Sequence, residues 1–349
     1  MNFCVYQDIG TEIHGYLVPD GFATSPVVKV CLNGDTTGTE ISTWVFIEGA
    51  QRQGHHQTGN VGFILNDENV PGISSTPQVE ISDLESGLVF YRRAQPGQFI
   101  SKKVLRVETS IVPRVEIDLP LKNQFQFFAN NADHYGFETI RQMLEIIHQP
   151  SVYVSGRLLI NNYRVYIDYN IDITMIAMED PFYEMAKRLL VLSRLRRQDF
   201  TFISQRDKVI FRPVCDWLEG VDLEDEVQVI NAIRRAPKHA MSLLASPFTQ
   251  QLVASNPTEV ATLNDISKAL DILSQFDVFS ASYDDSGYLE HIAESLDISH
   301  EDLSIKPKSN AVSRLAGILR RDSRVAHTLE VDLVLHHFIE KAEMRALRA

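Results

Sequence analysis

The sequence predicts an α/β protein with a doubly wound parallel sheet and C-terminal helices, preceded by a small N-terminal β-sandwich. Three observations predict this fold class. Residues 125–143 and 171–190 each have the pattern of a buried strand that leads through a loop into a helix, which is the layout of nucleotide-binding α/β folds. Residues 1–95 alternate short apolar runs with turn residues, as β-sandwiches do. From residue 216 onward, amphipathic helical patterns dominate.

Composition limits the classes of function. The chain has 349 residues, of which 44% are hydrophobic and 23% charged, so it is long enough for two domains. Its formal net charge of −13 disfavours general binding to nucleic acids or anionic membranes, because both need basic patches. Three widely spaced cysteines predict neither a metal site nor a disulfide framework. With no signal peptide and no transmembrane segment in the sequence, we expect a cytoplasmic protein.

Residues 1–95 are predicted to form the β-sandwich as an accessory domain. Turn sequences such as Asn33-Gly34-Asp35 separate the apolar runs. The adjacent His55 and His56 would point to opposite faces of a strand, so we expect no metal site there. The expected strands span residues 13–18, 27–32, 42–48, 61–65, 78–81 and 87–91.

Residues 96–122 carry three prolines and are predicted to connect the sandwich to an α/β domain at 123–349, with residues 104–111 as a strand candidate inside the connector. The strands at 125–128 and 171–177 are expected to be neighbours or near neighbours in the sheet, with their loops at one end. Further strands are expected at 151–159, 163–168 and 276–279. The expected helices span residues 136–147, 181–192, 223–234, 263–273, 286–296, 311–320 and 325–347.

Four segments of the C-terminal part carry a family resemblance. Residues 127–140, 173–188, 269–298 and 330–342 resemble, in the same order, segments of the P-loop sulfotransferases that modify carbohydrates. These enzymes transfer a sulfuryl group from 3'-phosphoadenosine 5'-phosphosulfate to a sugar hydroxyl. The resemblance implies a P-loop sulfotransferase-like fold, that nucleotide as cofactor, and a carbohydrate or polysaccharide acceptor as partner; the cysteine and histidine spacings predict no metal.

The N-terminal part carries a looser resemblance. The glycine pattern of residues 54–63, followed by residues 87–93, resembles accessory β-domains fused to bacterial surface-polysaccharide transferases. This resemblance implies a module that docks a glycan or a protein partner, and simple structural support is the alternative.

The sulfotransferase resemblance also assigns candidate site residues. The first segment resembles the F-x-H-I-P-K-T-G-G-T-S loop for the 5'-phosphosulfate, and the second resembles the T-x-L-R-D-P-x-E-R segment for the 3'-phosphate. The catalytic candidates are His134 and Arg157, the latter standing at the histidine of a family serine-glycine-histidine. The implied cofactor contacts are Asn130, Asn131, Asp133, Tyr135, Gly136, Asp180, Lys187 and Arg188.

Two departures from the family pattern oppose nucleotide binding. Asp133 stands where the family has a lysine, and Glu179 replaces an arginine. A carboxylate that faces a phosphate at about 4 Å costs on the order of 4 kcal/mol. Arg157 is therefore expected either to contact an anionic ligand or to neutralise Asp133 or Glu179 within the protein. Asp180 also fits an ordinary helix N-cap before proline.

Three hypotheses follow. The first is an active sulfuryl or related transferase, which requires a positive cleft built from Arg157, Lys187 and Arg188. The second is a pseudoenzyme that serves glycan assembly without binding nucleotide. The third is a glycan-binding module, which would place exposed aromatic side chains on residues 1–95.

Overall fold

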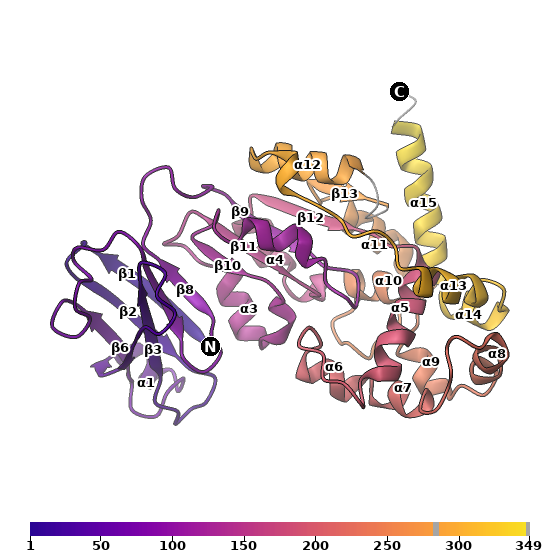
Figure 1. Ribbon diagram of the computed structural model, residues 1–349, viewed down its shortest axis with the longest axis horizontal. Helices are drawn as coiled ribbons and strands as arrows, with labels where there is room; N and C mark the ends of the chain where they lie inside the picture. Colours follow the sequence, from indigo (N-terminus) through magenta and orange to yellow (C-terminus); the bar gives the residue numbers. More distant parts are fainter. Residues whose placement is uncertain (282–285, 347–349) are drawn as a thin grey trace.

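The computed structural model describes residues 1–281 and 286–346 and shows a β-rich N-terminal part, a central parallel sheet and a helical C-terminal part (Figure 1). The predicted α/β class with N-terminal β-structure and C-terminal helices is confirmed. Residues 282–285, inside the third segment of the resemblance, and Leu347, at the end of the expected tail helix, lie outside the described residues.

Two antiparallel sheets form the N-terminal part and share one apolar core. Inward positions alternate along the strands, as with Phe3 and Val5 on one sheet and Val28 and Val30 on the other. The expected strand at 42–48 is instead two short strands followed by α1 (Glu48–Arg52), and the first strand was not predicted. The first sheet has, in order, β1 (Asn2–Asp8), β2 (Ile13–Val18), β6 (Asn60–Leu65) and β5 (Val45–Phe46). The second sheet has, in order, β4 (Thr39–Ser42), β3 (Val27–Leu32), β7 (Val79–Asp83) and β8 (Val89–Arg92).

The central sheet has five parallel strands. The first of these five strands along the chain, β9, lies in the middle of the sheet. The chain then forms β10 at one edge and, after β11 and β12, β13 at the other edge. Helices cover both faces, so the sheet is doubly wound: Leu105 and Ile176 pack on one side, Val104 and Met175 on the other. In sheet order, the strands are β10 (Phe127–Ala129), β11 (Val152–Gly156), β9 (Lys103–Val107), β12 (Ile173–Ala177) and β13 (Val278–Ser280).

The helices surround this sheet and extend beyond it (Figure 1). Helix α5 begins at the expected place because Asp180 accepts a hydrogen bond from the Tyr183 amide and Pro181 occupies the first turn. It packs against α13 in a separate apolar core. The α-helices after α1 are α2 (Val115–Asp118), α3 (Phe137–Leu144), α4 (Arg164–Asn170), α5 (Pro181–Arg194), α6 (Gln205–Ile210), α7 (Arg212–Trp217), α8 (Glu226–Arg234), α9 (Lys238–Ser242), α10 (Pro247–Val253), α11 (Ile266–Leu273), α12 (Ser286–Leu296), α13 (Asn310–Leu319), α14 (Ser323–Thr328) and α15 (Glu330–Ala346).

Three expectations need correction. The expected connector at 96–122 contains the central strand β9 and helix α2, so it belongs to the α/β core. The expected strand at 163–168 is helix α4, because Tyr163 and Ile167, four residues apart, are the buried pair while Val165 and Tyr169 face solvent. The strands at 125–128 and 171–177 share the sheet, but two strands lie between them.

The two parts of the chain share a continuous packed interface. The rings of Phe3 and Phe127 stack with centroids 5.9 Å apart, and both residues belong to a core that spans the sandwich and the parallel sheet. The Gln126 amide donates to the Arg92 carbonyl at 2.7 Å, and the Gln149 amide donates to the Phe90 carbonyl at 2.9 Å. The boundaries of separately folding units remain a prediction.

Limited proteolysis is expected to cut the exposed loop at residues 94–98, between β8 and β9. The shared core predicts that the two fragments stay together after cleavage. A denaturing gel should show two bands, while native gel filtration should show one peak at the volume of the intact protein. Two separate native peaks would contradict this prediction.

Candidate functional site

The strand order places the candidate site at the carboxyl ends of β9 and β12. In open parallel sheets, ligands bind beyond the strand ends where chain connections leave in opposite directions. Here the chain runs from β9 toward β10 at one edge and from β12 toward β13 at the other. The loop at residues 108–114 therefore stands at the switch point. The loop at 130–136, which the resemblance assigned to the phosphosulfate, instead follows the edge strand β10.

The loop after β9 directs its backbone N–H groups at carboxylates of the protein itself. Glu108 accepts hydrogen bonds from the amides of Thr109 and Ser110, both at 3.0 Å, and from the Arg114 amide at 2.7 Å. Glu184 of α5 accepts the Ile111 amide at 2.8 Å. We call these four N–H groups the amide nest. Converging backbone amides of this kind form anion sites in proteins, and here two buried side chains fill the site.

A buried charge network lies directly beneath the amide nest. Arg106 is only 1% exposed and makes two hydrogen bonds to Asp118, each 2.7 Å long. The same guanidinium donates to Glu108 at 3.2 Å. Asp118 also accepts the hydroxyls of Tyr153 at 2.6 Å and Ser155 at 2.9 Å. Burial alone would lower the pKa of Arg106, but Asp118 and Glu108 raise it well above its ordinary value, so the guanidinium stays charged.

The two cations expected to contact the 3'-phosphate, Lys187 and Arg188, lie on α5 and are paired with carboxylates of the protein itself. Lys187 lies 3.5 Å from both Glu179 and Glu184, and Arg188 donates to Glu184 at 2.9 Å. Glu179 is buried and also accepts a hydrogen bond from Arg114 at 2.9 Å.

Two neighbouring groups have structural roles as well. Lys187 donates to the Ser110 hydroxyl at 2.7 Å, as a lysine does beside the nucleophilic serine of some enzymes. Ser110 is fully buried, however, and donates its own proton to Glu184, so its role here is structural. Asp180 caps α5 and accepts a hydrogen bond from Arg320 at 2.6 Å.

Arg157 lies between two buried aspartates. Its backbone amide donates to Asp133 at 3.0 Å, and its guanidinium binds Asp133 at 3.4 Å and Asp207 of α6 at 2.5 Å. Burial opposes the charge of Arg157, but Asp207 and Asp133 raise its pKa above the ordinary value. The structure thus shows Arg157 as a counter-ion of Asp133, one of the two carboxylates expected from the sequence, and adds Asp207, which was not expected. Glu179 pairs elsewhere.

The other residues assigned to the first loop follow β10. Asn131 has a left-handed backbone (φ 57°), and the residues His134 and Gly136 are exposed, whereas Asn130 and Tyr135 are half-buried. The turn at residues 132–134 packs so closely on β11 that a side chain at Gly156 would lie 2.7 Å from the Ala132 amide nitrogen. A crevice between the loops lacks room for a water molecule; Glu108, Pro113, Asn131, Asp133 and Arg157 are among its lining residues.

The structure therefore brings Asn131, Asp133 and Arg157 together with Glu108, but not with His134, which is exposed. Lys187 and Arg188 of α5 reach the site through Glu184, whereas Asp180, the cap of α5, pairs with Arg320. Sequence reasoning missed the residues that organise the site: Arg106, Glu108, Ser110, Arg114, Asp118 and Asp207. One signal was present, since a strand pattern at residues 104–107, apolar except for Arg106, leads into Glu-Thr-Ser, but it lay inside the expected connector.

No family model, curated protein or solved structure matches the chain. Within residues 1–281 and 286–346, no three His, Cys, Asp or Glu side chains are grouped so that they could hold a metal ion. In the same described part, no helix combines the length and the apolar character needed to cross a bilayer.

Proposed function

We propose that the protein is a non-catalytic, sulfotransferase-like protein that binds glycan or acts as a scaffold in polysaccharide assembly. The main argument for a non-catalytic role is that Glu108 and Glu184 occupy the amide nest at the switch point of the sheet. The glycan context is supported by the resemblance of four segments to carbohydrate sulfotransferases.

The electrostatics of the site support this proposal over an active transferase. Phosphoryl and sulfuryl transfer depend on cations that are free to bind the transferring group. Here Arg157, Lys187 and Arg188 each bind buried carboxylates. A phosphate in the amide nest would have to displace Glu108 or lie beside it, at a cost on the order of 4 kcal/mol for a like-charge pair at about 4 Å.

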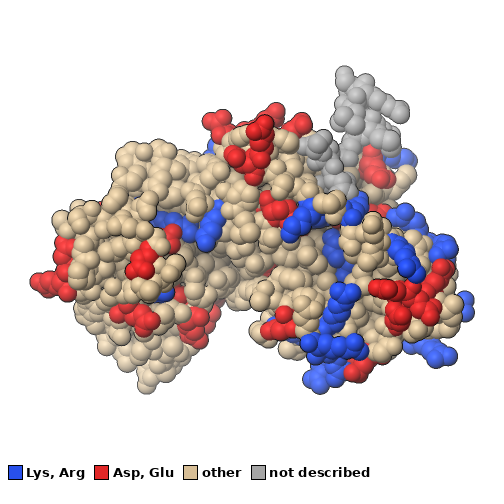
Figure 2. All heavy atoms as spheres, viewed as in Figure 1, with Lys and Arg blue, Asp and Glu red and all other residues tan. Residues whose placement is uncertain are grey.

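The surface of the sandwich supports the binding role. Phe22, Trp44 and Phe46 are each about half exposed, at 55%, 49% and 52%. Exposed aromatic rings combine a large apolar face with few rotatable bonds, and such faces suit the C–H surfaces of sugars. On the face shown in Figure 2, acidic side chains are scattered over the sandwich while basic ones concentrate over the helical part. This distribution disfavours an anionic ligand on this face of the sandwich.

Calorimetry with 3'-phosphoadenosine 5'-phosphate tests the loss of nucleotide binding. We expect no binding by the native protein, with a Kd weaker than about 1 mM, because the amide nest is filled and the nearby cations are paired. Thermal denaturation with and without the nucleotide provides a second measurement and should show no shift. Binding near micromolar would favour the active transferase and overturn the proposal.

A further inference from the structure

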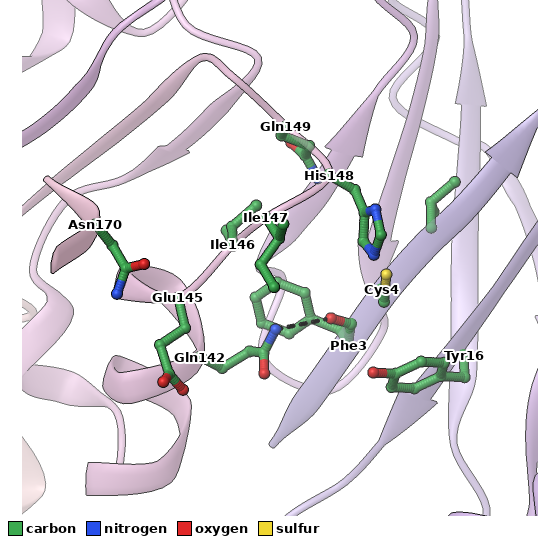
Figure 3. Close-up of a pocket in the computed structure, with 11 residues that line it drawn as sticks. Phe3, Cys4, Tyr16, Gln142, Glu145, Ile146, Ile147, His148, Gln149 and Asn170 are labelled. Carbon is green, nitrogen blue, oxygen red and sulfur yellow. Dashed lines mark hydrogen bonds between the residues drawn. The ribbon is translucent and has the colours of Figure 1, made fainter. Parts of the chain in front are cut away.

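A pocket of about 290 Å³ lies at the seam between the sandwich and the α/β part (Figure 3). The sandwich contributes Cys4 from β1 and Tyr16 from β2. The opposite wall comes from the end of α3, the following segment at residues 145–149, and Asn170 at the end of α4. Pockets for small ligands occur preferentially at such junctions. This one is separate from the carboxylate-filled site at the strand ends.

Three side-chain amides in the pocket lining donate hydrogen bonds to backbone carbonyl groups. Gln142 donates to Phe3 at 3.2 Å, a bond drawn in Figure 3. Gln149 donates to Phe90 at 2.9 Å, and Asn170 donates to Tyr166 at 3.0 Å. These bonds use an N–H group of each amide, and they leave the carbonyl oxygens of Gln142 and Asn170 open to a ligand, whereas that of Gln149 is buried.

The amide oxygens lack donors within the described part of the chain. Gln149 is 4% exposed, and its buried Oε1 accepts no hydrogen bond there. The side-chain oxygens of Gln142 and Asn170 accept none from described residues either, but they are not buried, so solvent or a ligand can reach them. A buried polar atom without a partner is unfavourable and calls for an explanation. A ligand rich in O–H groups, or a water held by that ligand, would supply the missing donors.

The charges of the pocket narrow the class of ligand. Neither lysine nor arginine lines it, His148 is the one lining side chain that can become cationic, and the carboxylate of Glu145 is bound by Arg141 at 2.8 Å. Burial raises the pKa of Cys4 to about 11 and also raises the pKa of Tyr16, so both are neutral at pH 7. Phosphate, sulfate and carboxylate ligands would find no lysine or arginine in the lining, and a purely apolar ligand would leave the amide oxygens unsatisfied.

We infer that this seam pocket binds a neutral saccharide unit, with the amide oxygens accepting sugar hydroxyls and Tyr16 offering its hydroxyl and ring. The inference rests on the proposed function and gives the glycan a site and a chemical class. It also assigns a role to the junction, because a sugar held there would contact both parts of the chain.

The test uses methyl glycosides of glucose, galactose, mannose and N-acetylglucosamine, with methyl glucuronide as the anionic comparison. Binding to the full chain is measured by saturation-transfer NMR and calorimetry. We expect at least one neutral glycoside to bind the native protein, and Tyr16→Phe and Asn170→Ala each to weaken that binding about three- to tenfold. The controls are Tyr6→Phe and Asn60→Ala, on the sandwich but outside the pocket, and they should bind as the native protein does.

The outcomes separate the pocket from the proposed function. Unchanged binding in both pocket variants would overturn the seam site but leave glycan binding to another surface, such as the one with Trp44. Preferential binding of methyl glucuronide would overturn the neutral class. If the native protein bound neither the glycosides nor an immobilised neutral polysaccharide, the glycan-binding function would fall with the site. Melting temperatures of all variants establish that lost binding is not lost folding.

Discussion

Replacing Arg106 by leucine is expected to lower the free energy of unfolding by about 3–5 kcal/mol. The substitution would remove the Arg106 guanidinium from Asp118 and Glu108, two carboxylates that are almost wholly inaccessible to solvent. It would also loosen the loop that follows β9, because Glu108 holds three amides of that loop. We therefore expect a loss of stability together with a disturbed loop at the carboxyl end of the central strand β9.

Chemical denaturation measures this effect, and two variants serve as controls. Tyr153→Phe removes one hydrogen bond to Asp118 and keeps the ring, so it should cost about 1 kcal/mol. Arg52→Leu removes an exposed ion pair with Glu48 and should change little. If Arg106→Leu cost no more than Tyr153→Phe, the buried network would not hold the loop in the way inferred from the contacts.

Arg157→Ala is expected to destabilise the protein by about 3 kcal/mol, toward the low end of the range for a broken buried pair. The variant would leave Asp133 without its cation, while Asp207 would keep a contact with Arg206 at 3.2 Å. Because Arg157 acts as an internal counter-ion, the substitution should lower the melting temperature without changing affinity for 3'-phosphoadenosine 5'-phosphate. A native protein that bound the nucleotide and lost it in this variant would instead make Arg157 a ligand contact.

The pH dependence of the same variant provides an independent measurement. Burial would raise the pKa of Asp207, but Arg157 and Arg206 outweigh it and the pKa lies below its ordinary value. A carboxyl with a lowered pKa in the folded state stabilises the protein above its unfolded pKa of about 4, and this contribution is lost as the pH falls through the folded pKa. Denaturation curves of Arg157→Ala should therefore depend less steeply on pH on the acid side than those of the native protein. Equal slopes would mean that Arg157 has little influence on Asp207.

The two predictions concern side chains that sequence reasoning treated differently. Arg157 was singled out because it follows a strand and the Ser155-Gly156 pair. The sequence left two roles for it open, ligand contact or internal counter-ion, because the choice depends on which residues surround it. The deciding neighbour, Asp207, lies 50 residues further along the chain. Arg106 lay inside the expected connector, so nothing marked it as the centre of a network.

The sequence by itself determined the features that depend on short spans of chain. Alternating apolar residues predicted β2 and β3 at their observed bounds, a continuous apolar run predicted β12, and Asp180 with Pro181 predicted the start of α5. These signals are reliable because strand and helix periodicity and N-caps act over a few residues. One exception, α4, is a short segment whose apolar residues fit both periods.

Only the tertiary structure decided which strands adjoin and which charges meet. The strand order places the switch point between β9 and β12. The loop at this point is therefore the one that contains Glu108, and not the loop after β10 that the sequence had suggested as the ligand site. Glu184 reaches the Ile111 amide from 73 residues away, and α5 brings it there because its apolar side packs in the adjoining core. Whether a carboxylate faces a ligand or neutralises a buried arginine depends on such long-range packing, and local sequence patterns do not encode it.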